Sequence, residues 1–256
     1  MIKSYINYLI KSKNEHSLHS PFLFDFYTKV VKDKTQYEDY RTVEQLRKKL
    51  LQNDSTIEVT DFGAGSRTGA SRHRKIKDIA QKASKKPYLA QFIYRTIRYF
   101  GYKNIIDLGT SLGLTTAYEA LAANNGKVIS FEGCPQTTQI ARTNLQELGI
   151  DNTEILVGNL DEILLKKIQK TERIDFAFFD ANHRYKPTIE YFKICLEKAY
   201  EDSCFVFDDI YWSDEMKQAW DEIKAHESVT ISIDFFWVGM VFFRKKQPKQ
   251  HFILRL

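Results

Sequence analysis

A glycine-containing turn between an apolar strand and a helix constrains this chain more than any other feature. Residues 104–108 form a short, mostly apolar run that ends before Gly109, and a helical pattern begins after Gly113. Glycines at this spacing let the backbone approach a ligand where a Cβ would collide. The helix start behind them offers unpaired N–H groups to an anionic group. We therefore predict a ligand-binding strand–turn–helix unit.

A second strand follows this helix and ends on an acid. The run 128–131 is followed by Glu132, which lies 25 residues after Asp107. A carboxylate at this place can accept both hydroxyls of a ribose. The dinucleotide fingerprint requires a glycine where this chain has Ser111, so a pyrophosphate fits poorly. The pattern predicts a nucleoside site of another kind.

The glycine turn is the first of four motifs that follow one another along the chain. They are Asp107-x-Gly109-x-x-x-Gly113 with Glu132, Gly158-Asn159-Leu160-Asp161-Glu162, the segment 174–185, and the segment 205–212. Together they resemble the class I S-adenosylmethionine (SAM)-dependent methyltransferases, and the last segment is similar to that of the catechol O-methyltransferase-like O-methyltransferases. The resemblance covers roughly residues 88–243.

This resemblance implies a Rossmann-like, doubly wound α/β fold. The sheet would have seven mostly parallel strands with an antiparallel last strand. The periodicity of the chain predicts strands at 104–108, 127–131, 154–157, 174–179, 203–207, 230–233 and 237–243. Helical patterns between the first five indicate right-handed crossovers and parallel pairing. We expect a helical extension with a glycine-containing basic loop over residues 1–86 and the methyltransferase domain over 87–256.

The resemblance also implies the residues that bind SAM. They lie in the glycine turn and at the ends of strands: Asp107, Gly109, Thr110, Ser111, Gly113, Glu132, Gly133, Asn159, Leu160 and Asp180. Glu132 would hold the ribose, and Asn159 would lie near the adenine, where an amide can pair with the purine edge. The alternative interpretation of Asn159 is an ordinary turn residue.

Two devices could remove the proton from an alcohol or phenol before methylation. His183, three residues after Asp180, is a candidate general base because imidazole titrates near neutral pH. His183 and Asp180 are thus the candidate catalytic residues. Asp180, Asp208 and Asp209 form a candidate Mg²⁺ site of carboxylates. The relatives usually have Asp-Asn at the last two positions. The alternative is that Asp209 caps a turn and Asp180 orients the cofactor, each paired without a metal.

A basic segment keeps other functions open. Residues 66–86 hold eight Lys or Arg residues and one acid, in a chain whose formal net charge is +5. Such a patch attracts phosphate or nucleic acid, although it lacks the aromatic residues that stack on single strands. The alternatives to a small-molecule O-methyltransferase are a methyltransferase for RNA or protein, and a non-catalytic nucleoside-binding protein. A nucleic-acid partner is not favoured, and a homodimer is left open.

Composition narrows the cellular setting. The longest apolar run, 235–243, is far too short to span a membrane, and the first residues lack the apolar core of a signal peptide. Three scattered cysteines favour neither a disulfide framework nor a zinc site. We expect a cytoplasmic protein with a small-molecule substrate and no membrane partner.

Two features lie N-terminal to the residues that resemble the methyltransferases. Residues 37–51 form a charge-rich amphipathic pattern, which predicts a helix that packs against the methyltransferase domain or a partner. Gly63 and Gly65 look like a second cofactor loop, but no strand ending in an acid follows at the required distance. We interpret that stretch as a loop near the mouth of the active site.

Overall fold

The computed structural model describes residues 2–14, 18, 20–60, 72–245 and 247–256. The chain divides into two compact units, Lys34–Ile163 and Met1–Asp33 with Leu164–Leu256. The loop around Gly63 and Gly65 lies outside the described residues. No described helix is long and apolar enough to cross a membrane. The division into domains at residue 86 stays a prediction.

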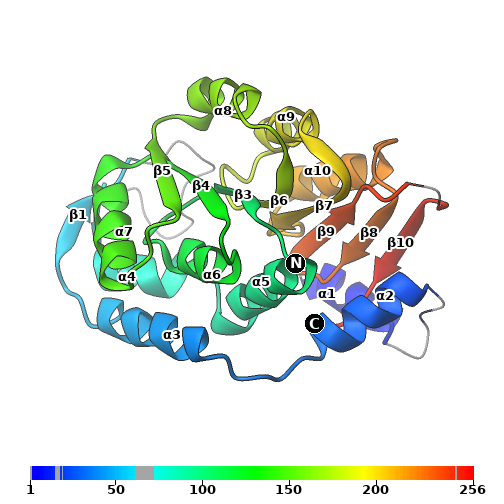
Figure 1. The fold of residues 1–256 in the computed structure, drawn as a ribbon, viewed down its shortest axis with the longest axis horizontal. Helices are drawn as coiled ribbons and strands as arrows, with labels where there is room; N and C mark the ends of the chain where they lie inside the picture. Colours follow the sequence, from blue (N-terminus) through cyan, green and yellow to red (C-terminus); the bar gives the residue numbers. More distant parts are fainter. Residues whose placement is uncertain (1, 15–17, 19, 61–71, 246) are drawn as a thin grey trace. The chain divides into compact units, whose positions relative to one another are not determined.

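The unit Lys34–Ile163 is built on three parallel strands (Figure 1). They are β3 (Asn104–Leu108), β4 (Lys127–Glu132) and β5 (Thr153–Val157), with β4 in the middle. Their helices are α5 (Pro87–Phe100), α6 (Leu114–Ala122), α7 (Pro135–Glu147) and the first residues of α8 (Leu160–Gln169). Parallel pairing brings the carboxyl ends of all three strands to one edge, where ligands of α/β folds bind.

The same unit begins with α3 (Glu38–Leu50), β1 (Thr56–Glu58), β2 (His73–Lys75) and α4 (Ile76–Lys82). The helix α3 buries one apolar face and adds two polar contacts. The Tyr118 hydroxyl of α6 donates to Glu44, and the Tyr94 hydroxyl of α5 donates to Asp39. The predicted helix over 37–51 therefore exists and packs against α5 and α6 of this unit.

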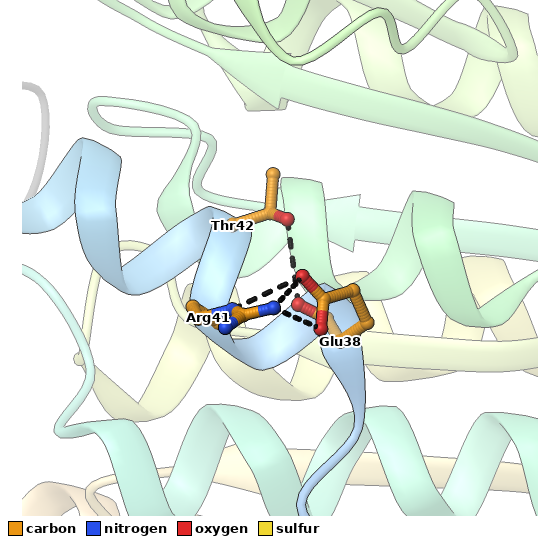
Figure 2. A network of polar contacts seen from close by, with 3 residues as sticks. All are labelled: Glu38, Arg41 and Thr42. Atoms are coloured by element: carbon orange, nitrogen blue, oxygen red, sulfur yellow. Dashed lines mark hydrogen bonds and ion pairs between the residues drawn. The ribbon is translucent and has the colours of Figure 1, made fainter.

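The other face of α3 is solvated. Figure 2 shows the Arg41 guanidinium donating to both carboxylate oxygens of Glu38, while the Thr42 hydroxyl donates to the Glu38 carbonyl at 3.3 Å. Both charged side chains are about two-thirds exposed or more, so this i, i+3 pair supports the helix start only weakly. An acid in the first turn also suits the helix dipole.

The second unit contains five paired strands in the order β10-β8-β9-β7-β6. They are β6 (Ile174–Phe179), β7 (Ala199–Asp208), β8 (Ile231–Asp234), β9 (Val238–Phe242) and β10 (Gln250–Ile253). The pair β6 and β7 is parallel, β9 is antiparallel to both β7 and β8, and β10 is parallel to β8. The helices are α1 (Ile2–Lys11), α2 (Pro21–Phe26), α9 (Tyr185–Leu196) and α10 (Asp214–Ala225), with a π-helical turn η2 (Tyr27–Val31) after α2.

The Rossmann-like fold class is confirmed, with one correction to the strand count. Apart from β1 and β2, which pair only with each other, three strands of the first unit and five of the second make eight among the described residues, against seven expected. The antiparallel strand is β9, as predicted, and β10 is the additional one. The sequence of β10, Gln-His-Phe-Ile, is half polar, and its first two residues are exposed. It therefore lacks the continuous apolar run that predicts a buried strand.

Large aromatic side chains fill the core of the second unit. Every residue of β6 and of β9 is buried, and the Phe179 and Phe207 rings stack at 4.3 Å between centroids. Gly239 has to be glycine, since a Cβ there would lie 2.7 Å from the Trp220 ring. This packing fixes the ends of β6 and β7, from which the candidate catalytic residues extend.

Candidate active site

The glycine turn has a left-handed backbone at three of its residues. The φ of Gly109 is +123° and that of Gly113 is +81°, and Ser111 between them also has a positive φ of +49°. The amides of Gly109 and Thr110 both donate to the Phe131 carbonyl of β4, at 3.0 and 3.1 Å. A φ near +123° strains any residue with a Cβ, so the turn requires Gly109 on conformational grounds.

Asp107 lies beneath this turn rather than at its surface. The residue is 0% exposed, and its Oδ2 accepts hydrogen bonds from the hydroxyls of Thr116 and Ser130, both at 2.7 Å. The Ser130 hydroxyl in turn bonds the Thr110 hydroxyl at 2.5 Å. Asp107 therefore ties β3, β4 and α6 to the turn, and its contribution to a ligand would act through the position of Thr110.

Glu132 joins the turn to the next helix. Its Oε2 accepts from the Ser111 amide at 2.8 Å, and its Oε1 accepts from the Cys134 amide at 2.9 Å. These two bonds orient the carboxylate at the edge of the turn, and a carboxylate can accept about four hydrogen bonds in all. Glu132 and Gly133 are both half-buried, which suits contact with a bound molecule.

Two other predicted residues have structural contacts. A Cβ on Gly113 would lie 3.3 Å from the Ala141 Cβ, so this glycine lets the start of α6 approach α7. Asn159 accepts the Asp161 amide on its side-chain oxygen at 3.2 Å and so caps α8, which begins at Leu160. The turn interpretation of Asn159 thus has support, and its amide nitrogen is the group that would face a purine.

The structure brings these segments of the first unit to one edge of its strands. Gly158 donates its amide to the Glu132 carbonyl at 3.0 Å, which places the start of α8 beside the end of β4. The glycine turn meets the same strand end through Ser111. The glycine turn, Glu132 and the start of α8 therefore meet at the end of β4.

In the second unit, a cluster of three ligand-type side chains lies at the ends of β6 and β7. Atoms of Asp180, His183 and Asp208 all lie within 4.8 Å of one another, and His183 Nε2 is 3.4 Å from Asp180 Oδ1. The backbone of Asn182 and His183 is left-handed, with φ of +67° and +48°. This tight turn folds the His183 side chain back toward Asp180, and such strained positions concentrate at functional sites.

Asp209 does not join this cluster among the described residues, although the sequence grouped it with Asp180 and Asp208. It has a left-handed backbone, with φ of +54°. Its amide donates to the Trp237 carbonyl, and its own carbonyl accepts the Trp212 amide, each at 2.8 Å. The side chains at the strand ends thus form a set of two carboxylates and an imidazole, not three carboxylates.

An aromatic pocket lies beside Asp209. Its lining residues are Asp209, Tyr211, Trp212, Phe236 and Trp237. The Tyr211 ring stacks on Phe236, with 5.0 Å between centroids and 16° between planes. The residues at 236 and 237 come from the turn between β8 and β9, which sequence reasoning did not assign to a site. An acid at the end of a strand followed by three aromatic residues, 234–237, was the signal available there.

A buried acid holds this pocket in place. Asp234, 1% exposed, accepts the Tyr211 hydroxyl at 2.5 Å and the Phe236 amide at 2.7 Å. Burial raises the pKa of Asp234, and the bonds from Tyr211 and Phe236 partly oppose this shift.

Tyr185, at the start of α9, makes contacts with α10. Its hydroxyl donates to Glu222 and its amide donates to Glu215, so Tyr185 connects the two helices.

We expect Tyr211→Phe to destabilise the protein by about 1–3 kcal/mol at neutral pH, because the buried Asp234 carboxylate loses a donor. A carboxyl whose folded pKa is raised adds stability when protonated, and this stability is lost as pH rises through the folded pKa. Removing the donor raises the pKa of Asp234 further. The loss should therefore be larger at pH near 7 than at pH near 4, measured by urea unfolding. Tyr99→Phe, at an exposed tyrosine, is the control; equal losses at both pH values would contradict this account.

Comparison with known proteins shows which family model these sites are similar to. Residues 106–210 match the family model described as a methyltransferase domain. All the predicted cofactor, catalytic and metal residues, from Asp107 to Asp209, lie within these matched residues. The pocket residues 236 and 237 lie beyond them.

Two curated relatives are named as O-methyltransferases. An O-methyltransferase (imqG) of Aspergillus flavus is 31% identical over 123 residues, which are 44% of this chain and 50% of that protein. A catechol O-methyltransferase of Niastella koreensis is 28% identical over 127 residues, 48% of this chain and 57% of that protein. The chain thus spans about half the length of the curated relatives it matches.

Solved structures confirm the fold over most of the chain. The O-methyltransferase TomG from Streptomyces achromogenes, in complex with SAM, is 16% identical, with a TM-score of 0.60 over 82% of this chain and 91% of that one. An O-methyltransferase from Bacillus cereus, in complex with SAH, has a TM-score of 0.56 over 86% of this chain and 97% of that one, again at 16% identity. At this identity the likeness establishes the Rossmann-like fold alone.

Proposed function

We propose that this protein is a SAM-dependent O-methyltransferase that methylates a hydroxyl group of a small molecule. The observation that carries the proposal is the Glu132 carboxylate, which two backbone amides orient at the edge of the glycine turn. This arrangement supports binding of a nucleoside that carries a ribose but no phosphate. The names of the relatives, O-methyltransferase and catechol O-methyltransferase, support the reaction.

The residues of the first unit fit SAM. Glu132 would accept the two ribose hydroxyls, as a carboxylate oriented by backbone amides can. The amide nitrogen of Asn159 would donate to the adenine, and the turn from Gly109 to Gly113 would lie against the methionyl part. Thr110, held by Ser130 above Asp107, gives that turn its shape. When bound, SAM supplies an electrophilic methyl group.

In the second unit we propose that His183 accepts the proton of the substrate hydroxyl. Asp180, 3.4 Å from His183 Nε2, would orient the imidazole and stabilise its charged form. The aromatic pocket around Trp212 and Trp237 offers an apolar surface for the carbon skeleton of the substrate. A phenol or catechol would match both features.

A divalent cation is the second candidate for activating the hydroxyl. The observed donor set of Asp180, His183 and Asp208 includes an imidazole, which suits Mn²⁺ or Zn²⁺ better than the Mg²⁺ that carboxylates alone favour. A cation bound there would lower the pKa of the substrate hydroxyl. In that case His183 would be a ligand and could not serve as the base.

Chelation separates these two candidates. If a cation is required, EDTA should abolish turnover, and Mn²⁺ should restore it at a lower concentration than Mg²⁺, because one ligand is an imidazole. Asp208→Asn should then lose turnover while it retains SAM binding. If His183 acts as the base, activity should be indifferent to chelator. The measurement is a methyl-transfer assay with isotopically labelled SAM and a panel of catechols, phenols and alcohols.

The basic segment supports a second function only weakly. Within its described part, the ammonium groups of Lys75 and Lys77 both pair with Asp54, at 3.0 and 2.6 Å. Part of the positive charge is therefore compensated within this unit. A methyltransferase for RNA would show salt-sensitive RNA binding, and its absence together with methylation of a small hydroxyl compound would favour our proposal.

A further inference from the structure

The helix α1 presents its apolar face to solvent. The exposed fractions are 78% for Ile10, 53% for Ile6, 41% for Tyr5 and 39% for Leu9. Their spacing, i, i+1, i+4 and i+5, places all four on one side of the helix. Among the side chains of α1 whose burial is described, residues 4–11, the buried one is Tyr8, at 7%. An amphipathic helix normally buries its apolar side, so this orientation is the reverse of the usual one.

Specific contacts hold α1 in this orientation. The Tyr8 hydroxyl donates to the Leu254 carbonyl at 2.6 Å, and the Tyr5 ring packs edge-on against Phe236 at 4.8 Å. After the helix, Lys13 pairs with Leu254 as a β-bridge. The apolar face is therefore preformed, and a partner would not have to pay the entropy of ordering it.

Basic residues lie next to this face in the part of the chain that the structure describes. Lys11 and Lys13 are exposed, and exposed Arg255 lies beside them through its bonds to Ser12 and to the Leu9 carbonyl. Residues 1–14 contain no acid. Basic residues next to an exposed apolar helical face are typical of helices that lie in the surface of an anionic bilayer.

A second copy of the chain fits this surface less well. In a symmetric pair the same patch meets itself, so Lys11 and Lys13 of each copy would approach those of the other. Residues 1–14 offer no acid to compensate them, and like charges brought together oppose association.

We propose that α1 docks this protein on the surface of an anionic membrane, with Ile6, Leu9 and Ile10 in the boundary between headgroups and acyl chains. The basic residues that follow the helix would contact the anionic headgroups. The sequence analysis predicted no membrane partner because no apolar run is long enough to span a bilayer, and a surface contact needs no such run. This property goes beyond methyl transfer and does not depend on it.

Flotation of the full chain with lipid vesicles tests this proposal. The protein should float with vesicles of phosphatidylglycerol and phosphatidylcholine in equal parts at low salt. It should float much less with phosphatidylcholine alone, and high salt should release it. The double variants Ile6→Asp/Ile10→Asp and Lys11→Glu/Lys13→Glu should each reduce the bound fraction at least about tenfold. Leu165→Asp, at a 41% exposed leucine of α8, is the matched control and should float like the wild type.

Circular dichroism and SAM affinity report whether each variant is folded. Three results would overturn the proposal: no flotation of the wild type with anionic vesicles, equal flotation of the Ile6→Asp/Ile10→Asp variant, or equal loss in Leu165→Asp. Light scattering after size exclusion adds a fourth. A dimer that Ile6→Asp/Ile10→Asp dissociates, in a protein that does not float, would assign this face to a second copy.

Discussion

His183→Ala should lower kcat about 10²–10⁴-fold on a true substrate, the usual contribution of a general base. The imidazole lies beside Asp180 at the end of β6, and its left-handed backbone directs it there. SAM affinity should stay nearly unchanged, because the residues proposed to hold SAM's ribose, adenine and methionyl part lie in the first unit. The measurements are steady-state kinetics and calorimetry on the same preparation. His73→Ala, at an exposed histidine of β2, is the control. Full turnover in His183→Ala would show that this residue is structural.

Chemical rescue distinguishes the two roles of His183. If it is the base, added imidazole should restore part of the turnover of His183→Ala, because the space left by the side chain can hold a replacement base. If it is a metal ligand, excess Mn²⁺ should restore turnover, since Asp180 and Asp208 would still bind the ion. Rescue by neither, with SAM binding intact, would contradict both proposed roles.

Glu132→Ala should weaken SAM binding by about 1–3 kcal/mol, roughly tenfold to a hundredfold in Kd. The variant loses the hydrogen bonds to the ribose and also leaves the amides of Ser111 and Cys134 without their acceptor. Glu132→Gln should fall between, because one acceptor oxygen remains. Glu147→Ala removes an acid of the same unit that pairs with Lys49 on the surface and should bind SAM as the wild type does. An unchanged Kd in Glu132→Ala would refute the proposed role of this acid.

Several strands of the Rossmann-like fold could be predicted because a strand buried on both faces needs a continuous run of apolar residues. The bounds of β3 and β6 agree with the expected 104–108 and 174–179, since continuous apolar runs of this length are typical of strands covered on both faces. Glu132 could be found because it follows such a strand. The family resemblance added the roles of Asn159 and Asp180, which no local pattern shows.

Residues whose role depends on backbone conformation could not be predicted. Nothing local in the sequence shows that Asn182 and His183 both adopt left-handed φ, which brings His183 into the cluster while Asp209 stays out of it. Asp107 looked like a ligand-contacting acid, but its burial beneath Thr110 depends on the pairing of β3 with β4. The pocket residues at 236 and 237 reach Tyr211 through long-range strand pairing, which sequence periodicity does not reveal.

Calorimetric titration of the purified protein with SAM tests the central claim most directly. We predict one site with a Kd in the micromolar range, equivalent to about 7–8 kcal/mol, and weaker binding in Glu132→Ala. NAD should bind much more weakly, because Ser111 stands where a pyrophosphate would need a glycine. No binding of SAM, or tighter binding of NAD than of SAM, would contradict this account.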